Sequence, residues 1–221
     1  MKRLIFIIAL AFSTSAMAQS IREQIAANPN LAGGIYTAYM SSGLYSGNLT
    51  LLPDIQSDLV MAVEGNSNNH GEIYQWTFRP TNREIESVYA GLYTVIGRCN
   101  FYLDQVEELR SSLTDDEEIQ YLDYYTGEVY CARALAYSEL LKCYCKAYDP
   151  ATADSELGVV LADSYFGEKP AKRASLKDSY KFVIADLNKA EELLDEKSQK
   201  LQTAFFDKIN DEVLACTDWN N

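Results

Sequence analysis

The sequence predicts a mainly α-helical fold, in which helical hairpins form a tetratricopeptide-like scaffold with loop-rich insertions. Residues 129–144 place apolar side chains on nearly every face of a helical wheel. Two capping-box patterns, at 81–84 and 114–117, precede long apolar repeats, and Ser175 opens a third helix. A helix that is apolar all round must be buried on several sides, so 129–144 should be the centre of the fold.

The N-terminus reads as a secretory signal peptide. Met1-Lys2-Arg3 is basic, residues 4–12 are apolar, and Ala16-Met17-Ala18 is a cleavage pattern. A membrane anchor would need roughly 20 apolar residues, about twice this run. We therefore expect residues 1–18 to be removed on export, leaving a helical domain over 19–221.

Charge argues against nucleic acid as a partner. The 221 residues carry 32 acidic and 19 basic side chains, a formal charge of −13, and loss of the signal peptide lowers it to about −15. Phosphate recognition requires clustered Lys and Arg, and no such cluster is present.

The five cysteines indicate neither a metal site nor a disulfide framework. Cys143-Tyr144-Cys145 lacks zinc-knuckle spacing, and the only histidine is His70. Cys131 and Cys143 fall within the apolar helix, where a free thiol behaves as a small hydrophobe. We expect no metal and no cofactor.

The first third of the chain has weaker signals. A helix is expected over 31–40, and 51–63 fits either a short helix or an extended segment. A Gly/Asn-rich loop follows at 64–71. Alternation of Tyr74, Trp76 and Phe78 favours a short extended piece.

Long helices are expected after this point. The Thr81 box should begin a helix running to about Arg110, and the Thr114 box a second one running to about Lys146, which Pro150 limits. Their short connection predicts an antiparallel pair. The apolar positions expected on the inner face of the first are Ile85, Val88, Tyr89, Leu92, Ile96, Cys99, Leu103 and Val106.

A second, shorter hairpin is expected after the loop at 148–174. Ser175 opens its first helix, and a fourth helical segment follows residue 200 with Phe206, Ile209 and Val213. The inner positions expected on the helix after Ser175 are Leu176, Tyr180, Val183, Leu187, Ala190 and Leu194.

Two charges interrupt the central apolar run, Glu128 and Arg133. A buried charge is costly unless it is paired, so we expect a structural polar tie and no catalytic role. Five residues apart, the two lie on different faces, and each should meet a partner on another helix.

The loop before the first long helix is the predicted glycan-binding site. Asn66, Asn68 and His70 offer polar groups to sugar hydroxyls, and Tyr74 and Trp76 offer aromatic faces to sugar C–H groups. In the alternative interpretation this is a flexible surface loop with Trp76 packed in the core.

Four motifs in order resemble the N-terminal part of the SusD/RagB family. Residues 86–100 are similar to W-x-x-x-Y-x-x-I-x-x-x-N, with Glu86 replacing the leading aromatic residue. Residues 127–134 resemble G-E-A-x-F-x-R-A, 170–175 resemble P-x-R-x-S, and the helix from Tyr180 carries the D-L pair at 186–187. The resemblance covers roughly residues 30–195.

The resemblance implies a surface glycan-binding component of a nutrient-uptake complex. Such a protein lies on the extracellular face of the outer membrane and passes oligosaccharide to a TonB-dependent transporter of the SusC type. Family members are not enzymes. This chain lacks the family's lipobox Cys near Ala18 and is shorter than family chains, so we expect a truncated N-terminal portion of the domain.

Two other function classes remain as alternatives. One is a secreted helical-repeat module that only binds protein. The other is a glycoside hydrolase with paired carboxylates. The acids cluster at helix starts and on polar faces, where they cap and solvate, so we expect no enzyme.

Overall fold

The computed structural model describes residues 31–57, 59–60, 70–168 and 172–194. This part of the chain is mainly helical and carries one isolated β-bridge, between Leu157 and Ser175, as its only extended pairing. The prediction of a mainly α fold is confirmed. The helices are α2 (Leu31–Tyr39), α3 (Asn48–Gln56), α4 (Gly71–Tyr74), α5 (Arg83–Ser112), α6 (Asp116–Tyr144) and α7 (Leu176–Leu193).

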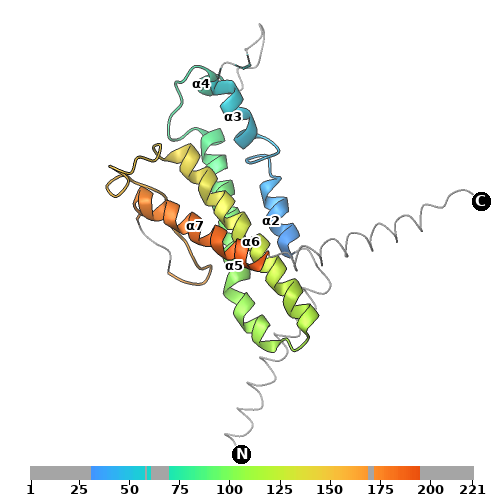
Figure 1. Cartoon of the computed structure of the whole chain (residues 1–221). Helices are drawn as coiled ribbons and strands as arrows, with labels where there is room; N and C mark the ends of the chain where they lie inside the picture. Colours follow the sequence, from blue (N-terminus) through green and yellow to red (C-terminus); the bar gives the residue numbers. More distant parts are fainter. Residues whose placement is uncertain (1–30, 58, 61–69, 169–171, 195–221) are drawn as a thin grey trace, which may run out of the picture.

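The two longest helices, α5 and α6, form an antiparallel hairpin joined by residues 113–115 (Figure 1). Helix α7 packs along α6, and α2 packs against α5 and α6. Helix α6 therefore contacts three other helices, as its apolar wheel predicts. The signal peptide and the fourth helical segment lie outside the described residues.

Helix starts agree with the sequence to within one or two residues, but two caps differ from the predicted ones. Asn82, not Thr81, caps α5, and its Oδ1 accepts from the N–H groups of Glu84 and Ile85 at 3.1 and 3.2 Å. Asp115, not Thr114, accepts from Glu118 N–H at 3.4 Å. Asn and Asp cap at least as well as Thr, so the start moves one residue inward. Ser175 caps α7 as predicted.

The core is centred on α5 and α6. Leu92, Val95, Ile96 and Cys99 on α5 are fully buried against Val129, Ala136, Tyr137 and Leu140 of α6. Within α5, Tyr89 is exposed, which corrects one predicted inner position.

One face of α6 is not covered by the described residues. Cys131, Leu135 and Cys143 are exposed, so the two thiols within the apolar helix lie outside its buried face. The apolar groove beside Cys131 and Leu135 is also lined by Tyr36 and Tyr39 of α2 and by Leu194.

Helix α7 presents a different inner face from the predicted one. Leu176, Ser179, Val183, Asp186 and Ala190 are buried, whereas Leu187 is exposed. Asp186 takes the inner position expected for Leu187 because its carboxylate pairs with Arg133 of α6.

The N-terminal region adds α3 and α4 to one end of the hairpin. Within segment 51–63 the residues up to Gln56 belong to α3, which contains Pro53, and residues 58 and 61–63 lie outside the described residues. Residues 71–74 form α4 and Trp76 lies in the turn after it, so the prediction of a short extended piece over Tyr74, Trp76 and Phe78 is wrong.

The loop after α6 is held against the hairpin by two tyrosines, Tyr93 of α5 and Tyr137 of α6. Tyr93 Oη donates to Val160 O at 3.0 Å and accepts from Val160 N–H at 3.1 Å. Tyr137 Oη makes the same pair of bonds with Ala162, at 2.9 and 2.8 Å. These bonds satisfy backbone groups that no strand pairs. Among the described helices, none has the length and hydropathy of a membrane span.

Candidate functional site

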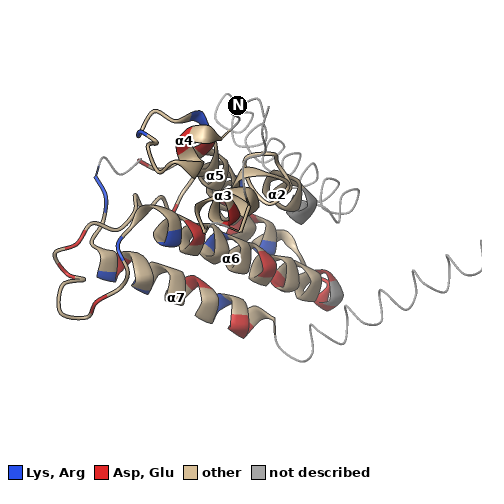
Figure 2. Ribbon diagram, turned by 90° about the horizontal axis from the view of Figure 1, so that it is seen from above, with Lys and Arg blue, Asp and Glu red and all other residues tan. Residues whose placement is uncertain are grey.

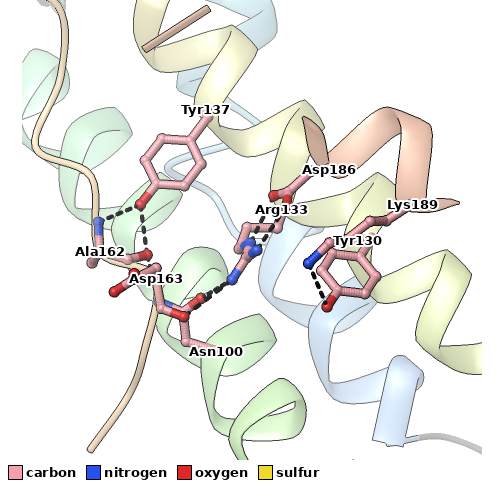
Figure 3. A network of polar contacts seen from close by, with 8 residues as sticks. All are labelled: Asn100, Tyr130, Arg133, Tyr137, Ala162, Asp163, Asp186 and Lys189. Atoms are coloured by element: carbon pink, nitrogen blue, oxygen red, sulfur yellow. Dashed lines mark hydrogen bonds and ion pairs between the residues drawn. The ribbon is translucent and has the colours of Figure 1, made fainter. Parts of the chain in front are cut away.

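Arg133 joins three helices and a loop through one buried guanidinium (Figure 3). Its Nε and Nη2 each donate to an Asp186 carboxylate oxygen at 2.7 Å, and its Nη1 donates to Asn100 Oδ1 at 2.7 Å. A longer bond, 3.4 Å, reaches Asp163 O. Burial lowers the pKa of Arg133, but the Asp186 carboxylate more than compensates, so the net shift is upward.

This guanidinium has no access to a ligand. The side chains of Arg133 and Asp186 are 6% and 4% exposed, and Tyr130 and Phe182 lie over the guanidinium with ring centroids at 5.4 and 5.1 Å. The two parallel hydrogen bonds to Asp186 and the bond to Asn100 give this guanidinium a structural role, which is to hold the three helices together.

Glu128 lies elsewhere on α6 and does not contact Arg133. Its carboxylate accepts from Tyr124 Oη at 2.7 Å within the same helix. Burial, and then the nearby Glu128 carboxylate, raise the pKa of Tyr36 on α2. The two charges of the central run therefore serve separate contacts on different faces.

The predicted glycan site is described only in part. Asn66 and Asn68 lie outside the described residues. His70, Tyr74 and Trp76 lie at the short helix α4, which leads into α5 (Figure 1).

Trp76 ends α4 in a position that normally belongs to glycine. Its N–H donates to Ile73 O at 3.1 Å, and the N–H of Thr77 donates to Glu72 O at 2.9 Å, which is the bonding of a Schellman cap. In a Schellman cap the first residue after the helical turn adopts a left-handed backbone conformation. Trp76 occupies this position and has φ = 56°. For a bulky side chain this conformation costs about 1–2 kcal/mol.

Trp76 is 62% exposed, so the alternative interpretation in which it packs in the core is wrong. Its nearest aromatic neighbour is the half-buried Phe78, with ring centroids 6.2 Å apart. Packing therefore does not explain either the strained backbone or the large ring in water. Strained residues gather at binding sites, and an exposed indole can stack on the C–H face of a sugar.

His70 and Tyr74, next to this turn, are both half-buried. Tyr74 is half-buried against the core. His70 Nδ1 lies 3.8 Å from Glu84 Oε1, and Asn82 Nδ2 donates to Glu72 Oε2 at 3.4 Å. These two contacts join α4 to the first turn of α5, which fixes the position of Trp76.

A second group of exposed aromatic rings was not anticipated from the sequence. Phe101 on α5 lies 5.3 Å from Tyr165 and 5.8 Å from Phe166, and the latter two are 5.1 Å apart between centroids. Their exposed fractions are 40%, 47% and 70%. The adjacent Tyr165-Phe166 before Gly167, in a segment otherwise rich in polar residues, was the available signal.

No group of His, Cys, Asp and Glu that could hold a metal ion occurs in the described part of the chain. The four cysteines described, Cys99, Cys131, Cys143 and Cys145, are free thiols.

Comparison with protein families matches residues 16–209 to a SusD-like family model described as starch-binding and associating with the outer membrane. The chain belongs to the SusD-like family. Asn100, Arg133 and Asp186, which meet in Figure 3, come from three of the sequence motifs that resemble this family. No curated protein matches the chain.

Solved structures of SusD-like proteins share the fold. A Bacteroides vulgatus protein designated as sugar-binding is 26% identical, with a TM-score of 0.59 over 75% of this chain and 36% of its own. SusD superfamily proteins of Bacteroides vulgatus and Bacteroides thetaiotaomicron are 22% and 17% identical, with TM-scores of 0.60 and 0.58. They are covered over 37% and 36% of their own lengths, and this chain over 76% and 75%. This SusD-like chain thus spans a little over a third of each neighbour.

Proposed function

We propose that this SusD-like chain is the glycan-binding component of a nutrient-uptake complex on the extracellular face of the outer membrane. It binds oligosaccharide without cleaving it and passes it to a TonB-dependent transporter of the SusC type. The family's description as starch-binding and outer-membrane-associated supports this proposal, as does the sugar-binding designation of a 26% identical structure.

The observation that carries the proposal is the exposed Trp76 in a left-handed conformation. The backbone that carries its ring is held in place by the His70–Glu84 contact and the Asn82–Glu72 bond, which join α4 to α5. A fixed aromatic platform loses little conformational entropy on binding, which favours weakly bound ligands such as sugars. Asn66 and Asn68, a few residues earlier in the chain, are proposed to supply hydrogen bonds to sugar hydroxyls, with His70 and Tyr74 beside them.

Fluorescence titration tests the proposal. The sequence has two tryptophans, so Trp219→Phe leaves Trp76 as the single reporter. Addition of a binding oligosaccharide, from a panel of host and plant glycans, should quench or shift its emission saturably. Tyr148→Ala, which removes an exposed ring from another loop, should leave the titration unchanged. A flat response to every member of the panel would contradict the proposal.

A second candidate is a module that only binds protein. It is favoured by the groove between α2 and α6, where Tyr36, Cys131 and Leu135 are exposed. Apolar surface of this kind is typical of a protein contact. Capture of the transporter by a chain that binds no sugar would favour this second function.

A further inference from the structure

A cavity of about 570 Å³ lies between α2, α5 and the loop after α6. Its wall includes Gly34 from α2, Gly97, Arg98 and Phe101 from α5, and Tyr165 from the loop. The volume is in the range of small-ligand sites, and two lining residues, Phe101 and Tyr165, belong to the aromatic cluster that they form with Phe166.

The aromatic side of the cavity is held rigidly by Asp104. Its Oδ2 accepts from Ser164 Oγ at 2.9 Å and from the N–H groups of Tyr165 and Phe166 at 2.7 and 3.0 Å. Ser164 Oγ also accepts from Gly167 N–H at 2.9 Å. The loop thus presents two large rings to water through four hydrogen bonds, although folding alone would favour their burial.

Gly97 leaves the middle of α5 open toward this cavity. A Cβ atom added there would have no neighbour within 4 Å. Glycine in a helix interior costs about 1 kcal/mol relative to alanine, and close packing does not require it here. An open backbone beside exposed aromatic rings suits the close approach of a ligand.

The polar groups of the cavity select an anionic ligand. The hydroxyls of Tyr93, Thr94 and Tyr102 are engaged with Val160, Ala90 and Thr126. Arg98 donates one N–H to Gly34 O, and among the described residues its guanidinium has no acidic partner. The remaining N–H groups of Arg98 are therefore the polar donors left for a ligand, and their planar fork matches a carboxylate.

The overall field of the protein does not attract an anion. The chain carries a formal charge of −13, and acidic positions occur on α4, α6 and α7 in Figure 2. In such a chain, an arginine without an acidic partner among the described residues can act on an acidic ligand only at short range. Its effect should therefore be a contact effect on affinity and not long-range steering.

We infer that this cavity binds a uronic acid unit of an oligosaccharide, with the carboxylate on Arg98 and the C–H face of the pyranose against Phe101 and Tyr165. The inference rests on the proposed glycan-binding function and assigns to it an acidic class of sugar. This cavity does not include Trp76. Its lining residues come from α2, α5 and the loop after α6.

Isothermal titration of the full chain tests this site. The probes are trigalacturonate and a hyaluronan tetrasaccharide, with neutral maltotriose for comparison. Arg98→Gln should weaken binding of the acidic probes by about tenfold to a hundredfold, as expected for loss of a charged hydrogen bond. Binding of maltotriose should not change. Gly97→Leu, whose side chain enters open space, should block the acidic probes while the melting temperature is kept.

Arg83→Gln is the matched control, because Arg83 is an exposed arginine on the same helix and outside the cavity. It should leave all affinities unchanged. Acidic probes whose affinity is unaltered by both Arg98→Gln and Gly97→Leu would overturn this site, while the proposed glycan binding would stand. Failure of every sugar, acidic and neutral, to bind would overturn the proposed function as well.

Discussion

Arg133 on α6 and Asp186 on α7 form a two-pronged ion pair with both N–O distances at 2.7 Å, although 53 residues separate them in sequence. Asn100 of α5 completes the contact on the other side of the guanidinium. Three helices are thus fixed relative to one another by one buried charge. This relationship explains why an arginine interrupts the apolar run of the central helix.

Loss of this pair should be strongly destabilising. Arg133→Met leaves the Asp186 carboxylate buried without its partner, and we expect the free energy of unfolding to fall by about 3–5 kcal/mol. Urea denaturation followed by circular dichroism measures it. Arg110→Met, which breaks the exposed pair with Asp123, should cost about 0–1 kcal/mol.

The double variant Arg133→Met/Asp186→Leu should recover at least half of that loss, because no uncompensated charge remains. Equal stability of Arg133→Met and the wild-type protein would contradict the structural role of this arginine.

Two helical glycines should respond in opposite directions to alanine. At Gly127 a Cβ would lie 2.8 Å from Leu194 Cγ and 3.1 Å from Leu193 Cβ, so Gly127→Ala should cost about 1–3 kcal/mol by overpacking. At Gly97 an added Cβ would have no neighbour within 4 Å, so Gly97→Ala should raise the free energy of unfolding by about 0.5–1 kcal/mol. Thermal unfolding of the two variants shows whether each substitution raises or lowers the melting temperature. A destabilised Gly97→Ala would mean that the wall of the cavity is not open.

Alkaline pH should unfold the protein through its buried tyrosines. Burial raises the pKa of Tyr137 from 10.0 to about 12, and the pKa of Tyr102 to about 12. A raised pKa means that the stabilisation is complete below pH 10 and is lost as the pH rises through 12. For a shift of two units the loss is about 2–3 kcal/mol for each group.

Tyrosinate absorbance and ellipticity, recorded together against pH, test this expectation. The late-titrating tyrosines should ionise as the helices unfold. Tyr137→Phe should show a shallower decline of stability between pH 10 and 12, because it removes one of these groups. An unfolding free energy that is constant from pH 9 to 12 would be inconsistent with the burial described.

The left-handed backbone at Trp76 predicts a difference between two truncations. Trp76→Ala and Trp76→Gly both remove the ring, but only glycine adopts φ = 56° without steric cost. Trp76→Gly should therefore be more stable than Trp76→Ala by about 1 kcal/mol. Urea midpoints in the same buffer compare them. Equal midpoints would show that the backbone at Trp76 is unstrained.

Local sequence signals predicted the helices well. The apolar repeat of α5, the apolar wheel of α6 and the Ser175 cap place the long helices, because hydrophobic periodicity is set within each segment. Caps shifted by one residue, since Asn82 and Asp115 compete with the neighbouring threonines for the same N–H groups.

Features that depend on contacts between residues far apart in the chain could not be predicted from local sequence patterns. The inner face of α7 includes Asp186 and excludes Leu187, because the guanidinium of Arg133 outweighs one leucine side chain. Periodicity alone favours the leucine. The Phe101–Tyr165–Phe166 cluster likewise joins a helix to a loop some 60 residues later, through bonds to Asp104 that no local pattern indicates.

At Trp76, a local sequence pattern predicted the wrong backbone conformation. The alternation of Tyr74, Trp76 and Phe78 favoured an extended piece, yet a turn of helix ends in a Schellman cap at this point. The cap turns the indole outward because its residue is left-handed. The residue type suggested sugar contact, but its exposure depends on a backbone conformation that the sequence disfavours.

Calorimetric titration of Trp76→Gly and of the wild-type chain, with an oligosaccharide that the wild type binds, tests whether Trp76 is part of a glycan site. Affinity for this glycan should fall at least tenfold in Trp76→Gly, while the melting temperature of this variant is no lower than that of Trp76→Ala. Unchanged affinity in a folded Trp76→Gly variant would contradict the assignment of this platform to glycan binding.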